Sequence, residues 1–364
     1  MSKRFLVIIH DDFELLGNGA GDVAQLQYLP AVALMNMAHE RDIRITFMVE
    51  VAQQLAFVRH ENQQGIRIQR QLWDETVLLM KERRFDVQLH LHPQWINASY
   101  RNGHFAVSNV WNLGLYKDVD QQALIRDAID YLHALIKPRF PEYRVCAFKA
   151  GWWGLQPSKT ILSELCRVGV KVILGVREGL YIPASNVDYR TLEESLLPYY
   201  PDIDDITRIS AMQRDVAVVP LTPYIPGVLS LCRLGSHKLL RRYLYRNDGC
   251  TARVPTSIGT AFPKKHNFTL SLHPYRTHLK IGNYPFGYLK HSFDRVITQL
   301  RRHDAPRIPI VIESHTKLYK SYYKDLQRFM DYILERYESE IEFGTLTEFV
   351  DEISANPCLV RSKG

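Results

Sequence analysis

Histidines and acids stand together at several points where the sequence predicts that a β-strand ends. His90 and His92 are two residues apart on one predicted strand, so both imidazoles point to the same side of it. Such a pair can bind a metal ion, and a carboxylate from a neighbouring strand end completes a set of two histidines and one carboxylate. Asp11 or Asp12, which follow the first predicted strand, can supply that carboxylate. The sequence therefore predicts a metal site with positions left open for water and substrate.

This prediction carries a condition on the first strand. Adjacent residues of a regular strand point to opposite faces, so Asp11 and Asp12 reach one site only if the strand ends before them. The segment 13–21, which contains three glycines, is compatible with such an end. Taken singly, the acids are typical of helix caps or solvated loops, and the histidines are typical of a satisfied core pair. Their coincidence at matching strand ends favours the metal site, with His273 at another predicted strand end as a reserve ligand or acid.

Short β-rich apolar runs alternate with longer segments of helical period along most of the chain. This alternation predicts parallel strands joined by helical crossovers, and about seven to eight such units predict a closed or nearly closed α/β barrel. The predicted strands are Phe5–Ile9, Arg44–Val49, Asp86–Leu91, Arg144–Phe148, Lys171–Val176, Val216–Leu221, Phe268–Leu272, Ile308–Ile312 and Glu340–Phe343. The predicted helices include Gln71–Arg84, Val119–Lys137 and Tyr319–Tyr337. In such a barrel the loops at the carboxyl ends of the strands converge on one mouth, where the polar strand ends would meet.

We expect a single domain over 1–364, because no linker-like tract or internal repeat interrupts the chain. The alternation breaks at one long insertion, 223–267, within which 228–247 is predicted to be a helix with five basic residues and no acid. This helix either presents a solvated face or binds an anionic membrane surface or a lipid-linked substrate. The net charge of +7 is otherwise too diffuse to indicate nucleic acid.

The composition is that of a globular protein from a reducing compartment. An apolar share of 46 % and a charged share of 23 % exclude a disordered or collagen-like chain. Five cysteines without a CxxC pair fit buried thiols better than a disulfide framework. The apolar run Phe5–Ile9 is too short for a signal peptide, and the longest uncharged stretch, 216–232, carries three prolines. We therefore expect a cytoplasmic protein, either free or peripheral at the inner membrane face.

The motifs, taken in order, resemble those of the polysaccharide deacetylases of the NodB homology group, which are carbohydrate esterases. The resemblance covers nearly the whole chain, and the order and spacing of the motifs carry it more than any single one. The segments that carry it are His10–Glu14, Ile45–Val49, Val87–Pro93, Ala147–Gly154, Asp188–Arg190, Pro198–Pro201 and Ile310–His315. The resemblance implies a distorted, TIM-related (β/α) barrel with one long insertion.

The same resemblance implies a metal-dependent hydrolase that removes the N-acetyl group of an amino sugar during surface-polysaccharide assembly, of the O-antigen or capsule type. It implies that Asp11 is the general base and His315 the general acid. It also implies a divalent metal, with zinc the expected ion, held by Asp12, His90 and His92. These residue types suit the chemistry, because a metal polarises the amide carbonyl, a carboxylate takes the water proton, and an imidazole protonates the departing amine.

Five further residues are candidates for binding the amino-sugar or glycan substrate. Trp95, Trp152 and Trp153 offer flat apolar faces on which a sugar ring could stack, and core packing is the equal alternative. Asp188 and Arg190 belong to a segment that resembles the substrate side of a branch of this family.

Two departures from the family pattern leave alternatives open. Gln94 stands where the family has its second histidine, so His92 has to take that ligand's place. Lys149 stands where the family has an arginine, and we expect Lys149 to act in catalysis by positioning Asp11 and lowering its pKa. The alternatives are a hydrolase of a non-sugar amide or imide on the same fold, and an inactive member that only binds glycan.

Overall fold

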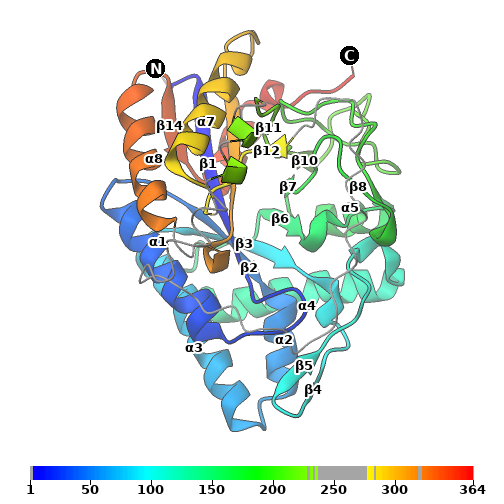
Figure 1. Ribbon diagram of the computed structural model, residues 1–364. Coiled ribbons are helices and arrows are strands. Elements are labelled where there is room, and N and C mark those ends of the chain that lie inside the picture. Colours follow the sequence, from blue (N-terminus) through cyan, green and yellow to red (C-terminus); the bar gives the residue numbers. More distant parts are fainter. Residues whose placement is uncertain are drawn as a thin grey trace.

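The computed structural model describes residues 3–227, 230–232, 234–236, 277–282, 284–318 and 322–363. Its centre is a curled eight-stranded sheet with parallel strand pairs (Figure 1). The strand order is β10-β7-β6-β3-β2-β1-β13, and β14 pairs with the first half of β1. The strands are β1 Phe5–Phe13, β2 Thr46–Glu50, β3 Asp86–Leu91, β6 Ala147–Ala150, β7 Val172–Leu174, β10 Ala217–Val218, β13 Ile308–Ser314 and β14 Ile341–Gly344.

Helices connect most of these strands and cover the sheet. In Figure 1, α7 and α8 lie side by side on one flank of the sheet, and α4 and α5 pack together on the other. The helices are α1 Leu29–His39, α2 Val51–Arg59, α3 Gln64–Glu82, α4 Asp118–Ile136, α5 Lys159–Arg167, α7 Phe286–Leu300, α8 Tyr323–Arg336 and α9 Leu346–Ala355. The remaining strands form three short pairs, which are β4 Ser99–Arg101 with β5 His104–Ala106, β8 Tyr181–Ile182 with β9 Val187–Asp188, and β11 Pro223–Tyr224 with β12 Thr277–His278.

This architecture confirms the predicted, distorted α/β barrel. The predicted strand Asp86–Leu91 coincides with β3. The predicted helix Val119–Lys137 agrees with α4 to within one residue at each end. The five basic residues of the predicted helix 228–247, the predicted strand Phe268–Leu272 and His273 lie outside the described residues. Among the described helices, none is long and apolar enough to cross a membrane.

Alternate residues of β1 pack into two separate parts of the core. Phe5 and Val7 belong to the large cluster between the sheet and the helices. Leu6 and Ile8 belong to a second cluster, built from residues of the other strands and from α9. We call the side of the sheet that carries Leu6 and Ile8 the inner face. Because every residue of β1 is buried, the strand packs on both faces, as expected for the centre of a parallel sheet.

β1 continues to Phe13, so the expectation that it ends before the paired aspartates is wrong. Its residues remain paired with β2 as far as Phe13 and with β13 as far as Asp11. The alternation of side chains therefore passes through the acidic motif. Asp12 lies on the inner face with Leu6 and Ile8, whereas Asp11 lies on the opposite face.

Candidate metal centre

The inner face changes from apolar to charged toward the carboxyl ends of the strands. Parallel register places these strand ends side by side, with Glu50 opposite His90 and His90 opposite Lys149. The polar residues that gather there lie at the strand ends or one residue beyond them: Asp12 and Glu14 at β1, Glu50 at β2, His90 and His92 at β3, Lys149 at β6, and Glu313 and His315 at β13. All are buried except His315, whose side chain is 13 % exposed. The carboxyl end of the barrel is thus the place where reactive side chains are expected in this fold.

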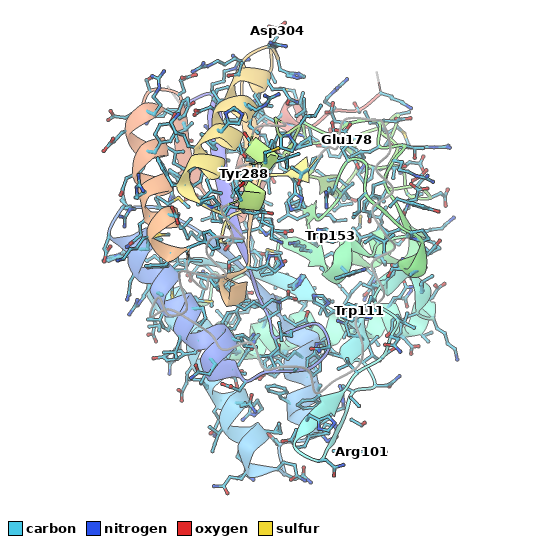
Figure 2. All side chains as sticks on the ribbon, viewed as in Figure 1. Arg101, Trp111, Trp153, Glu178, Tyr288 and Asp304 are labelled. Carbon is cyan, nitrogen blue, oxygen red and sulfur yellow. The ribbon has the colours of Figure 1, made fainter. Side chains whose placement is uncertain are left out.

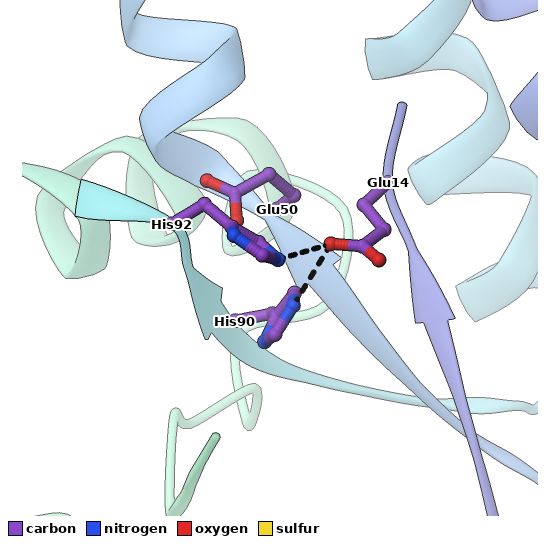
Figure 3. Close-up of side chains that lie close together, drawn as sticks. All are labelled: Glu14, Glu50, His90 and His92. Atoms are coloured by element: carbon purple, nitrogen blue, oxygen red, sulfur yellow. Dashed lines mark hydrogen bonds and ion pairs between the residues drawn. The ribbon is translucent and has the colours of Figure 1, made fainter. Parts of the chain in front are cut away.

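One group of potential metal ligands contains both histidines of β3. The ligand atoms of Glu14, Glu50, His90 and His92 all lie within 4.8 Å of one another (Figure 3). His90 Nε2 is 3.2 Å from Glu14 Oε2, and His92 Nε2 contacts the same oxygen. Glu50 begins α2 and accepts a hydrogen bond of 3.2 Å from the Gln53 backbone N–H. Two imidazoles and one carboxylate oxygen therefore converge on a single point.

The hydrogen bonding of His90 indicates that a cation fits at this point. His90 Nδ1 is 2.9 Å from the backbone oxygen of Lys149, which can only accept, so Nδ1 carries the ring proton. In the neutral ring, Nε2 then turns a lone pair toward the lone pairs of Glu14 Oε2. Two such atoms at 3.2 Å repel each other unless a metal ion or a proton lies between them. A hydrogen bond from the other ring nitrogen to a backbone carbonyl also orients histidine ligands in metal sites.

Gln94 and Gly151 hold the ring of His92 in place. Gln94 Nε2 donates to His92 Nδ1 at 2.9 Å and to the Gly17 backbone oxygen at 3.1 Å. A Cβ atom at Gly151 would lie 2.4 Å from the His92 ring, so the ring fits only because residue 151 has no side chain. In this arrangement His92 Nε2 carries the proton and donates it to Glu14. A half turn of the Gln94 amide would present Oε1 to Nδ1 and leave Nε2 free to bind a metal.

A second group of potential ligands adjoins the first and shares Glu14 with it. Its members are Asp12, Glu14 and His315, and His315 Nε2 is 3.1 Å from Asp12 Oδ2 and 3.7 Å from Glu14 Oε1. Asp12, which the sequence places with His90 and His92, thus belongs to this second group. The sequence prediction did not assign Glu14 as a ligand, and the structure makes it common to both groups.

Lysine ammonium groups contact both carboxylates of the second group. Lys149 Nζ donates to Asp12 Oδ2 at 2.5 Å and to Glu313 Oε2 at 2.9 Å. Lys317 Nζ donates to Glu14 Oε1 and, at 2.9 Å, to the backbone oxygen of Leu15. Both lysines are almost fully buried, so their charges depend on these partners.

The local charges divide the carboxylates of the centre into two kinds. Burial alone would raise the pKa of Asp12 and Glu14, but the neighbouring lysines and histidines hold both pKa values well below the usual range. Burial raises the pKa of Glu50 to about 8, and no lysine or arginine among the described residues is paired with it to offset that effect. Asp12 and Glu14 are therefore ionised as the chain stands, whereas Glu50 is protonated at neutral pH.

Asp11, the expected general base, is not part of either group. Its carboxylate accepts hydrogen bonds from Ser314 Oγ, from the Thr316 backbone N–H at 2.9 Å and from Thr316 Oγ1 at 3.1 Å. Lys149, which we expected to position Asp11, pairs with Asp12 instead, because Lys149 lies on the inner face of the sheet and Asp11 on the outer one. Asp11 thus ties β1 to the end of β13.

The two tryptophans that follow β6 stand beside the metal ligands. Trp152 and Trp153 both have left-handed backbone conformations, with φ of 54° and 57°, which for bulky residues costs about 1–3 kcal/mol each. The ring of Trp111 lies 6.4 Å from His92 and 5.1 Å from Trp152, and Trp153 lies 6.0 Å from Trp152, between centroids. Figure 2 marks Trp111 and Trp153 in the same part of the molecule. A row of aromatic rings thus leads away from His92.

The other predicted substrate-binding residues lie elsewhere. Trp95 is 2 % exposed and packs against Phe57 and Phe105, so its ring is a core side chain and leaves no face for a sugar. Asp188, on β9, and Arg190 form an ion pair of 2.7 Å, and Arg190 stacks over Tyr181. Their charges satisfy each other at an exposed hairpin.

Four residues of the centre were not assigned from the sequence, and three of them follow from one rule. Glu14 is two residues after Asp12, and Glu313 is two residues before His315, so the strand alternation used for His90 and His92 would have placed them on the same face. Glu50 directly follows the predicted strand Arg44–Val49 and is two residues after Met48, which lies on the inner face. Lys317 lies beyond the strand, in a short 3₁₀ turn (Thr316–Leu318); its place at a polar strand end is visible in the sequence, but its contact with Glu14 is not.

Comparisons with solved structures define the class of fold, which is that of the polysaccharide deacetylases. A protein from Mycobacterium smegmatis described as a polysaccharide deacetylase is similar with a TM-score of 0.53 at 11 % identity, covering 100 % of this chain and 94 % of that one. One from Pseudomonas aeruginosa, also described as a polysaccharide deacetylase, is similar with a TM-score of 0.52 at 12 % identity, covering 97 % of this chain and 92 % of that one. The PuuE allantoinase is similar with a TM-score of 0.51 at 12 % identity, covering 97 % of this chain and 91 % of that one.

No family model and no curated protein matches the sequence. At 11–12 % identity the structural likeness shows the fold alone. The function has to be argued from the side chains of the centre.

Proposed function

We propose that this protein is a metal-dependent hydrolase that removes the N-acetyl group of an amino sugar. The observation that carries the proposal is the convergence of His90 Nε2 and His92 Nε2 on one oxygen of Glu14 at the carboxyl end of the barrel. Solved structures of this fold that are described as polysaccharide deacetylases support the choice of reaction.

Glu14, His90 and His92 would hold a divalent ion, and Glu50 stands beside them as a fourth donor. Two histidines and a carboxylate suit zinc, which is the ion that we propose. When bound, it would supply Lewis acidity toward the carbonyl oxygen of the amide. With its amide turned so that Oε1 accepts from His92 Nδ1, Gln94 would leave His92 Nε2 free for this role.

Asp12 and His315 can move a proton between the attacking water and the departing nitrogen. Lys149 keeps Asp12 ionised, and Asp12 Oδ1 has no hydrogen-bond partner among the described residues. His10 Nδ1 lies 3.5 Å from this oxygen, and Oδ1 is the Asp12 oxygen that Lys149 does not hold, so it can accept the proton of a water molecule. His315, 3.1 Å from Asp12 Oδ2, is the most exposed member of the centre. Because burial lowers the pKa of His315 to about 4, the proton that it gives to the amine would be the one that Asp12 takes from the water. We assign the base to Asp12 and the acid to His315.

Trp152 and Trp153 are the proposed platform for the sugar ring. Both are half-buried, and the indole N–H of Trp152 is buried without a partner in the described part of the chain. A sugar hydroxyl could accept that hydrogen bond while the ring stacks on the aromatic faces. Asp188 and Arg190 would then bind substrate only at a distance from the reacting amide.

The proposed place of action is the cytoplasm, in the assembly of a surface polysaccharide. The substrate would then be a nucleotide-linked amino sugar, an oligosaccharide or a lipid-linked glycan. The basic segment 228–247 is a candidate contact for the last of these at an anionic membrane. Binding to anionic vesicles that fades with added salt would support this part of the proposal, and salt-insensitive or absent binding would remove it.

The test is acetate release by protein stripped with a chelator and then reloaded with zinc. The substrates are N-acetylated amino sugars as nucleotide-linked monomers and as oligosaccharides. We expect release to require zinc and to be lost in His92→Ala, while the matched control His104→Ala, a histidine of β5 outside the centre, behaves as the wild type. Release that survives both chelation and His92→Ala would refute the proposal.

Two other functions each have one supporting observation. The likeness to an allantoinase favours a non-sugar amide or imide as substrate, and turnover of allantoin in place of acetylated sugars would establish it. The lysines on Asp12 and Glu14 favour an inactive glycan-binding protein, because they neutralise the two carboxylates without a metal. Glycan binding that persists without metal and without acetate release would identify that case.

A further inference from the structure

The two oxygens of Glu14 face different partners. Oε2 faces the histidines of β3, with His90 Nε2 at 3.2 Å and His92 Nε2 in contact. Oε1 accepts a hydrogen bond from Lys317 Nζ and lies 3.7 Å from His315 Nε2. One carboxylate is therefore held by an ammonium group on one side and offered to two imidazoles on the other.

Lys317 is well placed to fix this orientation. It is 6 % exposed, and its ammonium donates to both Glu14 Oε1 and the backbone oxygen of Leu15, the next residue. Lys317, which lies in the turn after β13, thus holds the segment that follows β1 in place. A buried ammonium is stable only with such partners, so the contact is a strong constraint on where Glu14 can turn.

The lysines also decide which of the two ligand groups can take a metal ion. In the group of Asp12, Glu14 and His315, Lys149 contacts Asp12 Oδ2 and Lys317 contacts Glu14 Oε1. Both carboxylates of that group therefore have a lysine beside them, whereas in the other group only Glu14 has one, and it contacts Oε1. In the other group, no lysine contacts Glu14 Oε2 or Glu50 within the described residues.

We propose that Lys317 is a positioning residue for the metal centre: it holds Glu14 Oε1 so that Oε2 faces His90 and His92, and with Lys149 it restricts the protein to one divalent ion. The proposal rests on the proposed function in so far as Glu14 and the two histidines bind the ion. Partners of this kind, which hold a metal ligand without touching the metal, typically contribute 10–100-fold to metal affinity. Removing the ammonium should weaken binding by about that factor.

The experiment measures zinc affinity and stoichiometry by competition with a chromophoric chelator, in metal-stripped protein. We expect one ion per chain in the wild type and about 10–100-fold weaker binding in Lys317→Met. Lys317→Gln keeps a hydrogen-bond donor without the charge, so its zinc affinity should lie between those of the wild type and Lys317→Met. This variant tests the proposal if Lys317→Met does not fold. The matched control is Lys280→Met, since Lys280 pairs with Glu313 at 2.8 Å and does not contact Glu14. Its affinity should remain within about twofold of the wild type.

Unchanged or tighter binding in both Lys317 variants, or two ions per wild-type chain, would overturn the role of Lys317. That failure is separable from failure of the proposed function by including His92→Ala. If the wild type binds zinc and His92→Ala does not, the centre stands whatever Lys317 does. If the wild type binds no zinc, the proposed function itself fails. The cobalt-loaded proteins add a spectroscopic readout, because a turned Glu14 changes the visible absorption bands of the bound ion.

Discussion

Buried carboxylates occur at both ends of the inner face of the sheet, and their surroundings differ in kind. At the amino end, Asp86 begins β3 and accepts four hydrogen bonds of 2.8–3.2 Å from Thr46, Gln88 and Thr347. Every one of these donors is neutral. Since Thr347 lies in the first turn of α9, Asp86 joins β2 and β3 to the helix that closes this end of the barrel.

The carboxyl end is built in the opposite way. Asp12 and Glu14 face ammonium and imidazole groups, and several buried polar atoms there have no hydrogen-bond partner among the described residues. These atoms are Asp12 Oδ1, Glu50 Oε2, Gln94 Oε1 and both ring nitrogens of His10. A carboxylate saturated by neutral donors fixes the fold, whereas one surrounded by charge and unpaired atoms is prepared for a ligand. This matches the division of labour between the two ends of α/β barrels.

The largest expected effect is the loss of metal binding in Glu14→Gln. The amide keeps the size of the side chain but removes the charged oxygen on which both histidines converge. Zinc affinity should fall by more than about 100-fold, beyond what loss of an outer partner causes. Isothermal titration calorimetry with zinc measures it, and circular dichroism checks the fold. Affinity equal to that of the wild type would remove Glu14 from the centre.

The opposite result is expected at the other end of the barrel. Asp86→Ala leaves the donors of Thr46, Gln88 and Thr347 without an acceptor, which should destabilise the protein by about 3 kcal/mol. Zinc affinity of the folded protein should not change. Urea unfolding and zinc titration of the same sample decide the matter. A large loss of affinity with intact stability would mean that the two ends are not distinct.

Two adjacent residues sharpen the comparison at smaller scale. Asp12→Asn should keep zinc, because the ion is held by Glu14 and the histidines, and should lower the rate of acetate release by about 10²–10⁴-fold through loss of the base. Asp11→Asn should keep both zinc and most of the rate, because an amide oxygen can still accept from Ser314 and Thr316. Rates and zinc contents of the two variants are compared side by side. Loss of turnover in Asp11→Asn alone would restore Asp11 as the base.

The smallest expected effect concerns the helix that closes the amino end. Thr345 caps α9 in a reciprocal capping box with Glu348. Thr345→Ala should lower stability by about 1 kcal/mol and leave zinc binding and turnover unchanged. Thermal unfolding detects a difference of this size. A change in zinc affinity would show that α9 communicates with the metal centre.

The sequence predicts the fold and the histidine pair well, because both depend on local periodicity. The i, i+2 spacing of His90 and His92 on a strand places both rings on one face whatever the rest of the chain does. The error over Asp11 has a single cause, namely that the strand was expected to stop at Ile9 when it runs on to Phe13. Strand ends are set by pairing with neighbours, here β2 and β13, and such pairing is not visible in a local pattern.

Other features depend on contacts between distant parts of the chain. Lys317 reaches Glu14 across 303 residues of sequence, and the burial of Trp95 depends on Phe57 and Phe105. Neither contact leaves a mark in spacing or composition. The left-handed backbone of Trp152 and Trp153 is likewise a property of the loop after β6. The sequence shows two consecutive tryptophans at a strand end, but it does not show their backbone conformation.

The central claim is that His90, His92 and Glu14 hold one divalent ion. Anomalous X-ray scattering from crystals soaked with zinc tests it most directly. We predict one peak per chain, within bonding distance of Glu14 Oε2, His90 Nε2 and His92 Nε2. A peak at other residues, or no peak while these three side chains keep their positions, would contradict the account.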